Sequence, residues 1–164
     1  MVATANTPSL RAKEFHFPVS TSWTGGRRVE ACVHGKEPIE VTPPPEFRGT
    51  DPTTWSPEDL FVAAAASCLA VTFTGLAERG GLGYSALKVD GDGIAGRRAD
   101  GQFGFTHLFL RLEVETEAAD APRARELARR AEATCLVSAS LDLPVQTEIE
   151  ILCLPRPSGL PAAA

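Results

Sequence analysis

The sequence predicts an α+β protein in which antiparallel sheets wrap around one long, central, apolar helix. The run LFVAAAASCLAVTF, residues 60–73, contains no charged side chain, and a helix that is apolar on every side is normally surrounded by other elements. Segments on both sides of this run alternate apolar and polar residues, as half-buried strands do. A second helical segment, residues 121–134, has a single apolar stripe. Together they indicate the order strand, strand, strand, helix, strand, strand, helix, strand.

The composition is that of one globular domain. The chain has 164 residues, of which 43% are hydrophobic and 23% are charged, so it can bury a core without metal or disulfide bonds. Its net charge of -5 argues against nucleic acid as a partner. The N-terminus has no apolar signal segment, and the uncharged run is too short and too rich in alanine to span a membrane. We therefore expect a cytoplasmic protein with a single domain, residues 11–154, between disordered tails at 1–10 and 155–164.

The central helix has clear start and stop signals. Ser56 can cap its N-terminus, Pro57 suits the first helical position, and Glu58 lies where the helix dipole favours an acid. Gly80 and Gly81 can end it. The sequence therefore predicts a helix from about residue 57 to residue 80.

Before this helix we expect strands at 13–19, 27–34 and 39–42, separated by a turn at Trp23–Gly26 and another at Gly35. Residues 42–55 hold four prolines and should form a long irregular connection. A loop of this length in a compact domain is often functional.

After the helix we expect two antiparallel strands, at 86–94 and 103–115. In the second, alternation puts Phe105, His107 and Arg111 on one face and the leucines from Leu108 onward on the other. A helix then begins near Asp120, with Ala124, Leu127, Ala128 and Ala131 as its apolar stripe. A short turn or helix follows at 135–141, and the last strand is expected at 144–152. One small domain has few elements with which to cover the central helix, and a homodimer that shares it would solve this problem.

The four cysteines, at positions 32, 68, 135 and 153, form no C-x-x-C pair. Their spacing predicts no zinc site, and we expect neither a metal nor a cofactor. In a reducing cytoplasm each cysteine is either a small buried hydrophobic residue or a reactive thiol. Cys68, in the middle of the apolar helix, and Cys135, at the end of the second helix, are the candidates for reactivity.

Two motifs occur together around these thiols. The string WSPEDLFVAAAASC places Glu58 ten residues before Cys68, and AEATCLVSASL follows with Cys135, 67 residues after Cys68. In this combination, over roughly residues 15–152, the chain resembles the OsmC/Ohr family, the osmotically inducible and organic hydroperoxide resistance proteins.

The resemblance implies an intertwined homodimer and a thiol peroxidase. Cys68 would attack the peroxide, Cys135 would resolve the resulting sulfenic acid as a disulfide, and Glu58 would orient an activating arginine. Within the family this arginine comes either from a Gly-Gly-Arg hairpin, which matches Arg27, or from a later loop, which matches Arg48. Arg28 lies beside the first of them, and Arg27 is the preferred candidate. The expected reductant is an external dithiol, of which dihydrolipoamide is an example.

Elementary chemistry sets two conditions on this mechanism. An ordinary thiol has a pKa near 8.5, and an apolar site would raise it further, so Cys68 should need a nearby cation. Ten residues of helix place Glu58 about 15 Å from Cys68 along the axis. Either the helix begins after Glu58, or a long arginine bridges the gap from another strand or subunit.

A group of apolar residues near the thiols suits an organic hydroperoxide as the substrate, although such residues could equally be plain core. They are Phe47, Trp55, Leu60, Phe61, Leu136 and Val137. The alternative function is a non-catalytic stress protein of the same family, which would bind a hydrophobic ligand in the dimer cleft.

Overall fold

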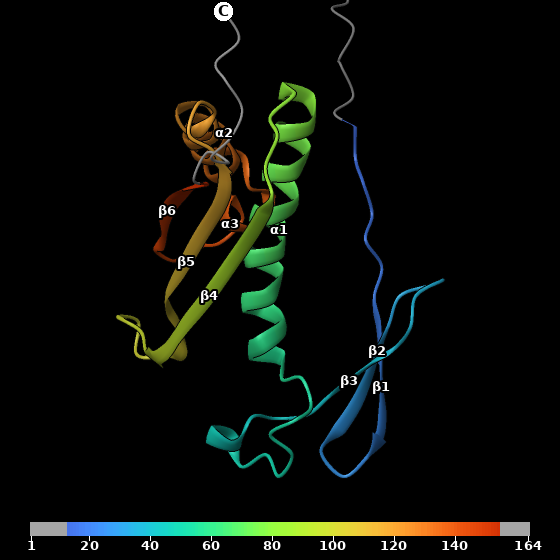
Figure 1. Ribbon diagram of the computed structural model, residues 1–164. Coiled ribbons are helices and arrows are strands. Elements are labelled where there is room, and N and C mark those ends of the chain that lie inside the picture. The colour runs from blue at the N-terminus through green and yellow to red at the C-terminus, as the bar shows by residue number, and fades with distance from the viewer. Residues whose placement is uncertain (1–12, 155–164) are drawn as a thin grey trace, which may run out of the picture. The chain divides into compact units, whose positions relative to one another are not determined.

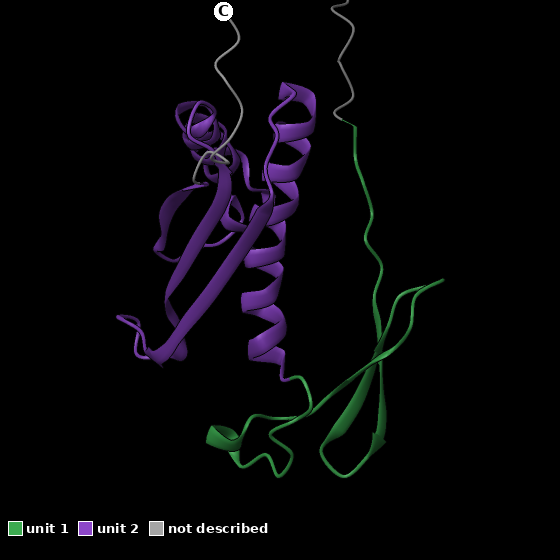
Figure 2. Ribbon diagram, viewed as in Figure 1, with its two compact units in different colours: residues 1–55 green, residues 56–164 purple. Residues whose placement is uncertain are grey.

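The computed structural model describes residues 13–154. The chain divides into two compact units at the junction of Trp55 and Ser56 (Figure 2). We call them the N-terminal unit and the C-terminal unit. The tails expected at 1–10 and 155–164 lie outside the described residues.

The N-terminal unit is a three-stranded antiparallel sheet followed by an irregular segment. Its strands are β1 (Ser20–Gly25), β2 (Arg28–Cys32) and β3 (Ile39–Val41), in that order in the sheet. A single 3-10 turn, η1 (Pro45–Phe47), interrupts the connection that follows. The second and third strands and the irregular connection agree with the sequence analysis.

The first predicted strand is wrong. Residues 13–19 have no regular structure, and β1 includes Trp23, which was expected in a turn. The hairpin turns at Gly26 and Arg27, so pairing extends outward from Gly25 and Arg28 until Ser20 faces Cys32. Pro18, which has no N–H to donate, lies just beyond the last pair.

The C-terminal unit contains the long helix, a three-stranded sheet and two further helices (Figure 1). Its elements are α1 (Pro57–Gly80), β4 (Ala86–Arg97), β5 (Phe103–Glu117), α2 (Ala121–Thr134), α3 (Leu136–Ala139) and β6 (Val145–Leu154). Strands β4 and β5 are antiparallel, whereas β5 and β6 are parallel. The expectation of purely antiparallel sheets is therefore wrong for β6, because α2 forms a crossover that returns the chain to the same end of the sheet. The α+β class and the long helix beside sheets are confirmed.

The ends of α1 are fixed by the residues that the sequence indicated. The Ser56 hydroxyl accepts a hydrogen bond from the Asp59 N–H at 3.0 Å, and the Asp59 carboxylate accepts one from the Ser56 N–H at 2.8 Å. This reciprocal pair is a capping box. Gly81 ends the helix in the left-handed conformation, with φ of 64°. Glu58 is thus inside the helix, which excludes a helix that begins after it.

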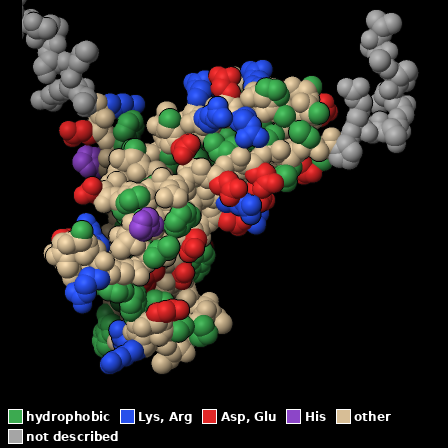
Figure 3. All heavy atoms as spheres, turned by 90° about the vertical axis from the view of Figure 1, so that its left-hand side faces the viewer, with side chains coloured by type: hydrophobic (Ala, Val, Ile, Leu, Met, Phe, Trp, Pro, Cys, Tyr) green, Lys and Arg blue, Asp and Glu red, His purple; other side chains and the backbone are tan. Residues whose placement is uncertain are grey.

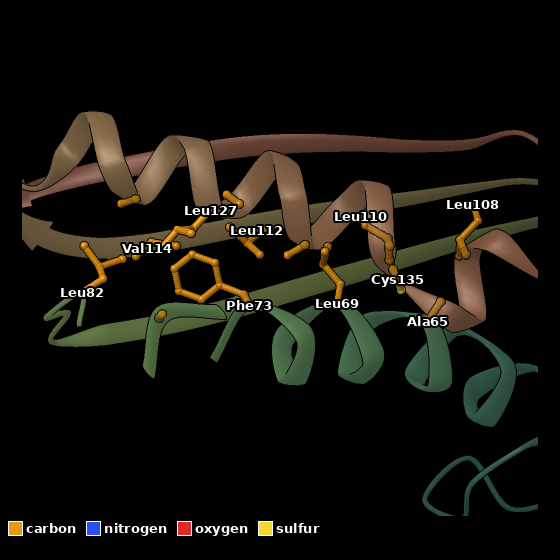
Figure 4. Packing of buried hydrophobic residues seen from close by; sticks show 14 residues of the cluster. Ala65, Leu69, Phe73, Leu82, Leu108, Leu110, Leu112, Val114, Leu127 and Cys135 are labelled. Carbon is orange, nitrogen blue, oxygen red and sulfur yellow. The ribbon is translucent and has the colours of Figure 1, made fainter. Parts of the chain in front are cut away.

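The core of the C-terminal unit lies between α1, β5 and α2 (Figure 4). Helix α1 contributes Ala65, Leu69, Phe73 and Ala77, which repeat every four residues along one stripe. Strand β5 contributes Leu108, Leu110, Leu112 and Val114. The apolar stripe predicted for α2 is buried at all four of its positions.

The opposite face of α1 is uncovered within this unit. Ala64 and Ser67 are exposed, and Val71 is 69% exposed. The expectation of a helix surrounded on all sides is therefore not met by the elements of this unit. The helix has 24 residues and is, by length and composition alone, apolar enough to cross a membrane, which corrects the expectation that it is too short. The core helix of a soluble protein passes the same test.

Strand β4 approaches α1 closely at Gly91. A Cβ atom at this position would lie 2.7 Å from Cγ1 of Val62, so any other residue would displace the Val62 side chain. A glycine inside a strand often marks such a close approach. The pairing of β4 with β5 thereby fixes the position of the helix that carries Cys68.

A β-bulge in β5 changes the facing of one aromatic residue. The register passes from the pair Ile94 and His107 to the pair Ala95 and Phe105, so Thr106 is an extra residue. Phe105 therefore turns to the α1 side, where it stacks on Phe61 with ring centroids 4.4 Å apart. The expectation that Phe105 shares a face with His107 is wrong for this reason.

The outer face of the same sheet is charged. Figure 3 shows acidic and basic side chains gathered together there. Arg111 of β5 lies within ion-pair distance of Glu113, Glu148 and Glu150. The sheet therefore has one dry face, toward α1 and α2, and one solvated face.

Candidate functional site

The two candidate thiols meet where α1 packs against α3. Cys68 lies in the middle of α1 and is half-buried, whereas Cys135 lies between α2 and α3 and is 1% exposed. The Cys135 thiol is close enough to the Cys68 sulfur to lower the pKa of Cys68. Both are free thiols. The fold thus brings together two cysteines that are 67 positions apart in the sequence.

The Cys68 sulfur is surrounded by hydrogen-bond donors. They are the backbone N–H groups of Val137 and Leu136, the Cys135 thiol and the Thr72 hydroxyl. Burial raises the pKa of the Cys68 thiol, but these hydrogen bonds lower it, and the net effect is a pKa below the ordinary value. Donors directed at the sulfur favour the thiolate because they stabilise its negative charge.

This environment changes one condition set by the sequence analysis. An acidic Cys68 was expected to require a cation, whereas the first turn of α3 already supplies stabilising N–H groups. Thr72 and these two backbone groups are site features that the sequence analysis missed. The signal for Thr72 was present, since it follows Cys68 by four residues and so lies on the same helix face.

Cys135 has a hydrogen-bond partner of its own. The Ser138 hydroxyl donates to its sulfur at 3.3 Å. Cys135 also precedes the first residue of α3, and its carbonyl accepts the Ala139 N–H at 3.0 Å. The buried thiol is therefore held in place by the short helix that follows it.

Glu58 is separate from the thiols and lacks a partner for one oxygen. Capping of α1 is carried out by Asp59, so Glu58 is not the capping acid. Its Oε2 atom is buried and has no hydrogen-bond partner within residues 13–154. A buried acceptor without a donor costs free energy, so this carboxylate is suited to receive a donor such as a guanidinium.

The candidate arginines lie in the N-terminal unit. Arg27 donates from Nη1 to the carbonyl oxygens of Phe47 and Arg48, at 3.0 and 3.2 Å. Arg48 follows η1 and has a φ of 64°. Arg28 is paired with Glu40 and, at 3.1 Å, with Asp51. The fold therefore brings Arg27 beside the loop that carries Arg48 and occupies Arg28 with carboxylates. The role of Arg27 or Arg48 toward Cys68 stays a prediction.

The predicted apolar pocket residues are divided between the two units. Phe47, 37% exposed, and Trp55, 52% exposed, belong to the N-terminal unit. In the C-terminal unit, Phe61 and Leu60 are half-buried on α1. The other two lie beside Cys68 on α3: Leu136 is 67% exposed, and Val137 packs against the core. Phe105, which stacks on Phe61, joins this set and was placed on the wrong face by the sequence analysis.

With this geometry established, comparison with known proteins identifies the family. The model of the family described as OsmC-like protein matches residues 49–150. The chain belongs to this family. Among curated relatives, the uncharacterized protein YmaD of Bacillus subtilis is 26% identical over 142 residues, which cover 84% of this chain and 93% of YmaD.

Solved structures of OsmC-like proteins share the fold. An OsmC-like protein of unknown function from Vibrio cholerae superposes with a TM-score of 0.75 at 20% identity, over 83% of this chain and 99% of that one. An organic hydroperoxide resistance protein from Elizabethkingia anophelis gives a TM-score of 0.67 at 18% identity, over 87% and 100%. OhrB of Bacillus subtilis, also an organic hydroperoxide resistance protein, gives 0.60 at 23% identity, over 84% and 98%. The resemblance to OsmC/Ohr proteins is thereby confirmed.

Proposed function

We propose that this OsmC-like protein is a thiol-dependent peroxidase that reduces organic hydroperoxides to alcohols. The observation that carries the proposal is the contact between two free thiols, one of which, Cys68, has a lowered pKa. The family includes organic hydroperoxide resistance proteins, and this supports the proposed substrate class. A thiolate is the nucleophilic form of cysteine.

The chemistry takes two steps. The Cys68 thiolate attacks the terminal peroxide oxygen, so an S–O bond forms, the O–O bond breaks and the alcohol leaves after taking up a proton. Cys68 is then a sulfenic acid, oxidised by two electrons. The Cys135 thiol attacks its sulfur, an S–S bond forms, and water leaves with the oxygen. An external dithiol, of the dihydrolipoamide type, returns the two electrons and restores both thiols.

A guanidinium is the proposed partner of the peroxide and of Glu58. An arginine keeps its charge at all relevant pH values, and a carboxylate can hold its fork in one orientation. The buried Oε2 of Glu58 supports this role because it lacks a donor within the described residues. Arg27 is the first candidate and Arg48 the second.

We further propose that the protein acts as a cytoplasmic homodimer that shares α1. Between Ala64 and Val71, the exposed face of α1 carries no charge. An uncharged helix face of this length is unfavourable in water and favourable between two copies of the chain. The proposed dimer also allows an arginine of one copy to serve Cys68 of the other.

The test is peroxide consumption by the purified protein with cumene hydroperoxide and a dithiol reductant. Cys68→Ser should abolish turnover. Cys135→Ser should retain one reduction of peroxide per subunit but form no intramolecular disulfide. Cys153→Ser is the matched control, because Cys153 is an exposed free thiol of β6, and it should behave as the wild type.

Two results would contradict the proposal. Full turnover in Cys68→Ser would exclude this cysteine as the nucleophile. Slow alkylation of Cys68 at neutral pH, together with no peroxide consumption, would instead favour a protein that binds a hydrophobic ligand without catalysis.

A further inference from the structure

The two thiols differ in how easily a molecule in solution can reach them. Cys68 is half-buried, whereas Cys135 is 1% exposed and belongs to the core cluster that includes Leu69 and Ala131. In the proposed mechanism a hydroperoxide has to reach Cys68, so a route from solvent to this sulfur is already required. The mechanism sets no such requirement for Cys135. A reductant that regenerates the thiols therefore meets the sulfur of Cys68 first.

This difference in access decides the direction of the regenerating step. A thiolate that reduces a disulfide attacks one sulfur and displaces the other, and the choice depends on access and on how well the displaced sulfur carries its negative charge. The donors around Cys68 would favour Cys68 as the displaced sulfur, since they stabilise its thiolate. Displacement of Cys68, however, requires attack on Cys135, which has almost no exposed surface. Access therefore outweighs charge stabilisation, and Cys135 is the sulfur that is displaced.

Ser138 is placed to stabilise the displaced sulfur. Its hydroxyl donates a hydrogen bond to Cys135 Sγ at 3.3 Å. The sulfur of a neutral thiol is a weak acceptor, whereas a hydrogen bond to an ionised group is about twice as strong as a neutral one. The hydroxyl therefore contributes most at the moment when Cys135 takes up negative charge, and a contact that strengthens in the transition state accelerates the step.

The backbone of α3 keeps Ser138 next to Cys135. The Ala139 N–H donates to the Cys135 carbonyl at 3.0 Å, and the Leu141 N–H donates to the Ser138 carbonyl at 3.2 Å. Residues three apart on a helical turn are neighbours, so the hydroxyl and the sulfur belong to one local unit. Because this unit includes no residue of α1, we expect the contact to remain when Cys135 is bonded to Cys68.

We propose that Ser138 is a catalytic residue of the regenerating step, in which it stabilises the Cys135 thiolate that is released when an external dithiol attacks Cys68. This inference rests on the proposed peroxidase function and assigns a residue to its reductive half. One thiolate of the dithiol forms an S–S bond with Cys68, the bond between Cys68 and Cys135 breaks, and its electron pair stays on Cys135, which then takes up a proton. The second thiol of the reductant attacks the reductant's own sulfur in this mixed disulfide. The reductant leaves as a disulfide, and Cys68 is released as a thiolate.

The first experiment identifies the sulfur that is attacked. It uses the full-length protein with Cys32 and Cys153 replaced by serine, oxidised with diamide, which joins neighbouring thiols without peroxide. Peptide mapping verifies the disulfide between Cys68 and Cys135. The oxidised protein is exposed briefly to 2-mercaptoethanol, a monothiol that stops at the mixed disulfide, and is quenched in denaturant with excess N-ethylmaleimide. Mass spectrometry should find mercaptoethanol on Cys68 and maleimide on Cys135.

The second experiment measures how fast dithiothreitol reduces the same disulfide. Ser138→Ala should slow this reduction about tenfold, because it removes one hydrogen bond to a sulfur that becomes charged. Ser138→Thr keeps a hydroxyl at this position and should retain most of the wild-type rate. Ser140→Ala is the matched control, since the Ser140 hydroxyl donates to the Leu136 carbonyl at 2.8 Å rather than to a sulfur. It should be reduced at the wild-type rate, whereas a general loosening of α3 would slow both alanine variants alike.

The proposal is overturned if mercaptoethanol is found on Cys135, if Ser138→Ala is reduced as fast as the wild type, or if Ser138→Thr or Ser140→Ala is as slow as Ser138→Ala. Failure of diamide to join Cys68 and Cys135 would overturn it as well. Because the disulfide is formed without peroxide, a wild type that consumes no hydroperoxide would contradict the proposed function and leave both of these measurements interpretable.

Discussion

The close approach of β4 to α1 predicts that Gly91→Ala destabilises the C-terminal unit. The added Cβ atom would lie 2.7 Å from Cγ1 of Val62, whereas ordinary contact begins at 3.4 Å. Its next neighbours, in Leu110 and Ala66, would be 3.5 and 3.6 Å away and need not move. The clash is therefore with one side chain of α1, which must retreat by about 0.7 Å, the difference between the first two distances.

The expected cost follows from two opposing effects. Overpacking a well-filled interior typically costs about 1–3 kcal/mol. Replacing glycine by alanine also restricts the unfolded chain, which offsets about 0.4–1 kcal/mol of this cost. We therefore expect Gly91→Ala to lower the free energy of unfolding by about 1–2 kcal/mol, measured by urea denaturation of the reduced protein.

A double-mutant cycle isolates the clash. Val62→Ala removes the methyl groups that Gly91→Ala would meet, so the two changes together should cost about 1 kcal/mol less than the sum of their separate effects. Gly96→Ala is the matched control in the same strand, because its Cβ would meet only Thr106, at 3.9 Å. It should leave stability unchanged or raise it slightly. Strict additivity of the double variant, or equal effects of Gly91→Ala and Gly96→Ala, would refute the reasoning.

Three further predictions concern the Cys68 thiol, the N-terminal cap of α1 and the Asp51 carboxylate. The pKa of Cys68 is lower in the folded protein than in the unfolded chain. The contribution of the Cys68 thiolate to stability therefore increases as pH rises through the folded pKa and is complete above the unfolded value near 8.5. The loss of stability caused by Cys68→Ser, measured by urea titration, should accordingly grow between neutral and alkaline pH. Ser56→Ala should lower the free energy of unfolding by about 1 kcal/mol, as the loss of a helix cap does. Hydrogen exchange should show weaker protection at the start of α1 in this variant. Ser138→Ala, which lies away from this cap, should show no loss of α1 protection. Hydrogen bonds from Thr53, together with Arg28, hold the pKa of Asp51 well below its usual range. The stabilising effect of the Asp51 carboxylate is therefore present above the unfolded pKa near 3.9 and is lost as pH falls through the folded value. In hydrogen exchange at neutral pH, β2 should be less protected in Asp51→Asn than in the wild type, and this difference should shrink in acid.

The sequence was most informative where local chemistry determines structure. The limits of α1 follow from Ser56, Pro57 and Gly81, whose side chains or backbone act within one turn of the helix. The burial of the α2 stripe follows from its helical period alone. These features depend on few residues that are close in sequence, so they could be predicted.

Long-range pairing limited the rest of the fold prediction. The bulge at Thr106 depends on how β4 and β5 align, and a single extra residue reverses the facing of Phe105. The parallel pairing of β6 depends on the path of α2 across the sheet. The strand expected at 13–19 failed because its alternation has no paired partner in the sheet, and alternation alone does not supply one.

In the candidate site, too, some features could be predicted from the sequence and others depend on the fold. Cys68, Cys135 and Glu58 could be selected from the motifs, because each is a side chain with its own chemistry. The donors to the Cys68 sulfur could not, since two of them are backbone N–H groups of Leu136 and Val137. Any residue except proline has such a group, so only the fold identifies which ones face the sulfur.

The position of α3 links the acidity of Cys68 to its expected oxidation. Cys68 belongs to α1, whose neighbouring Leu69 is 1% exposed and is packed in the core, so this helix has little freedom to move. The first turn of α3 provides the N–H groups that favour the thiolate, and Cys135, which directly precedes it, carries the thiol that would resolve the sulfenic acid. Formation of an S–S bond replaces a hydrogen-bonded contact between the sulfurs by a much shorter covalent one. Because Cys135 is 1% exposed and belongs to the same core cluster as Leu69, the approach of the two sulfurs has to disturb the packing of α1 against α3, and the hydrogen bonds that make Cys68 acidic in the reduced protein are the ones that this approach alters.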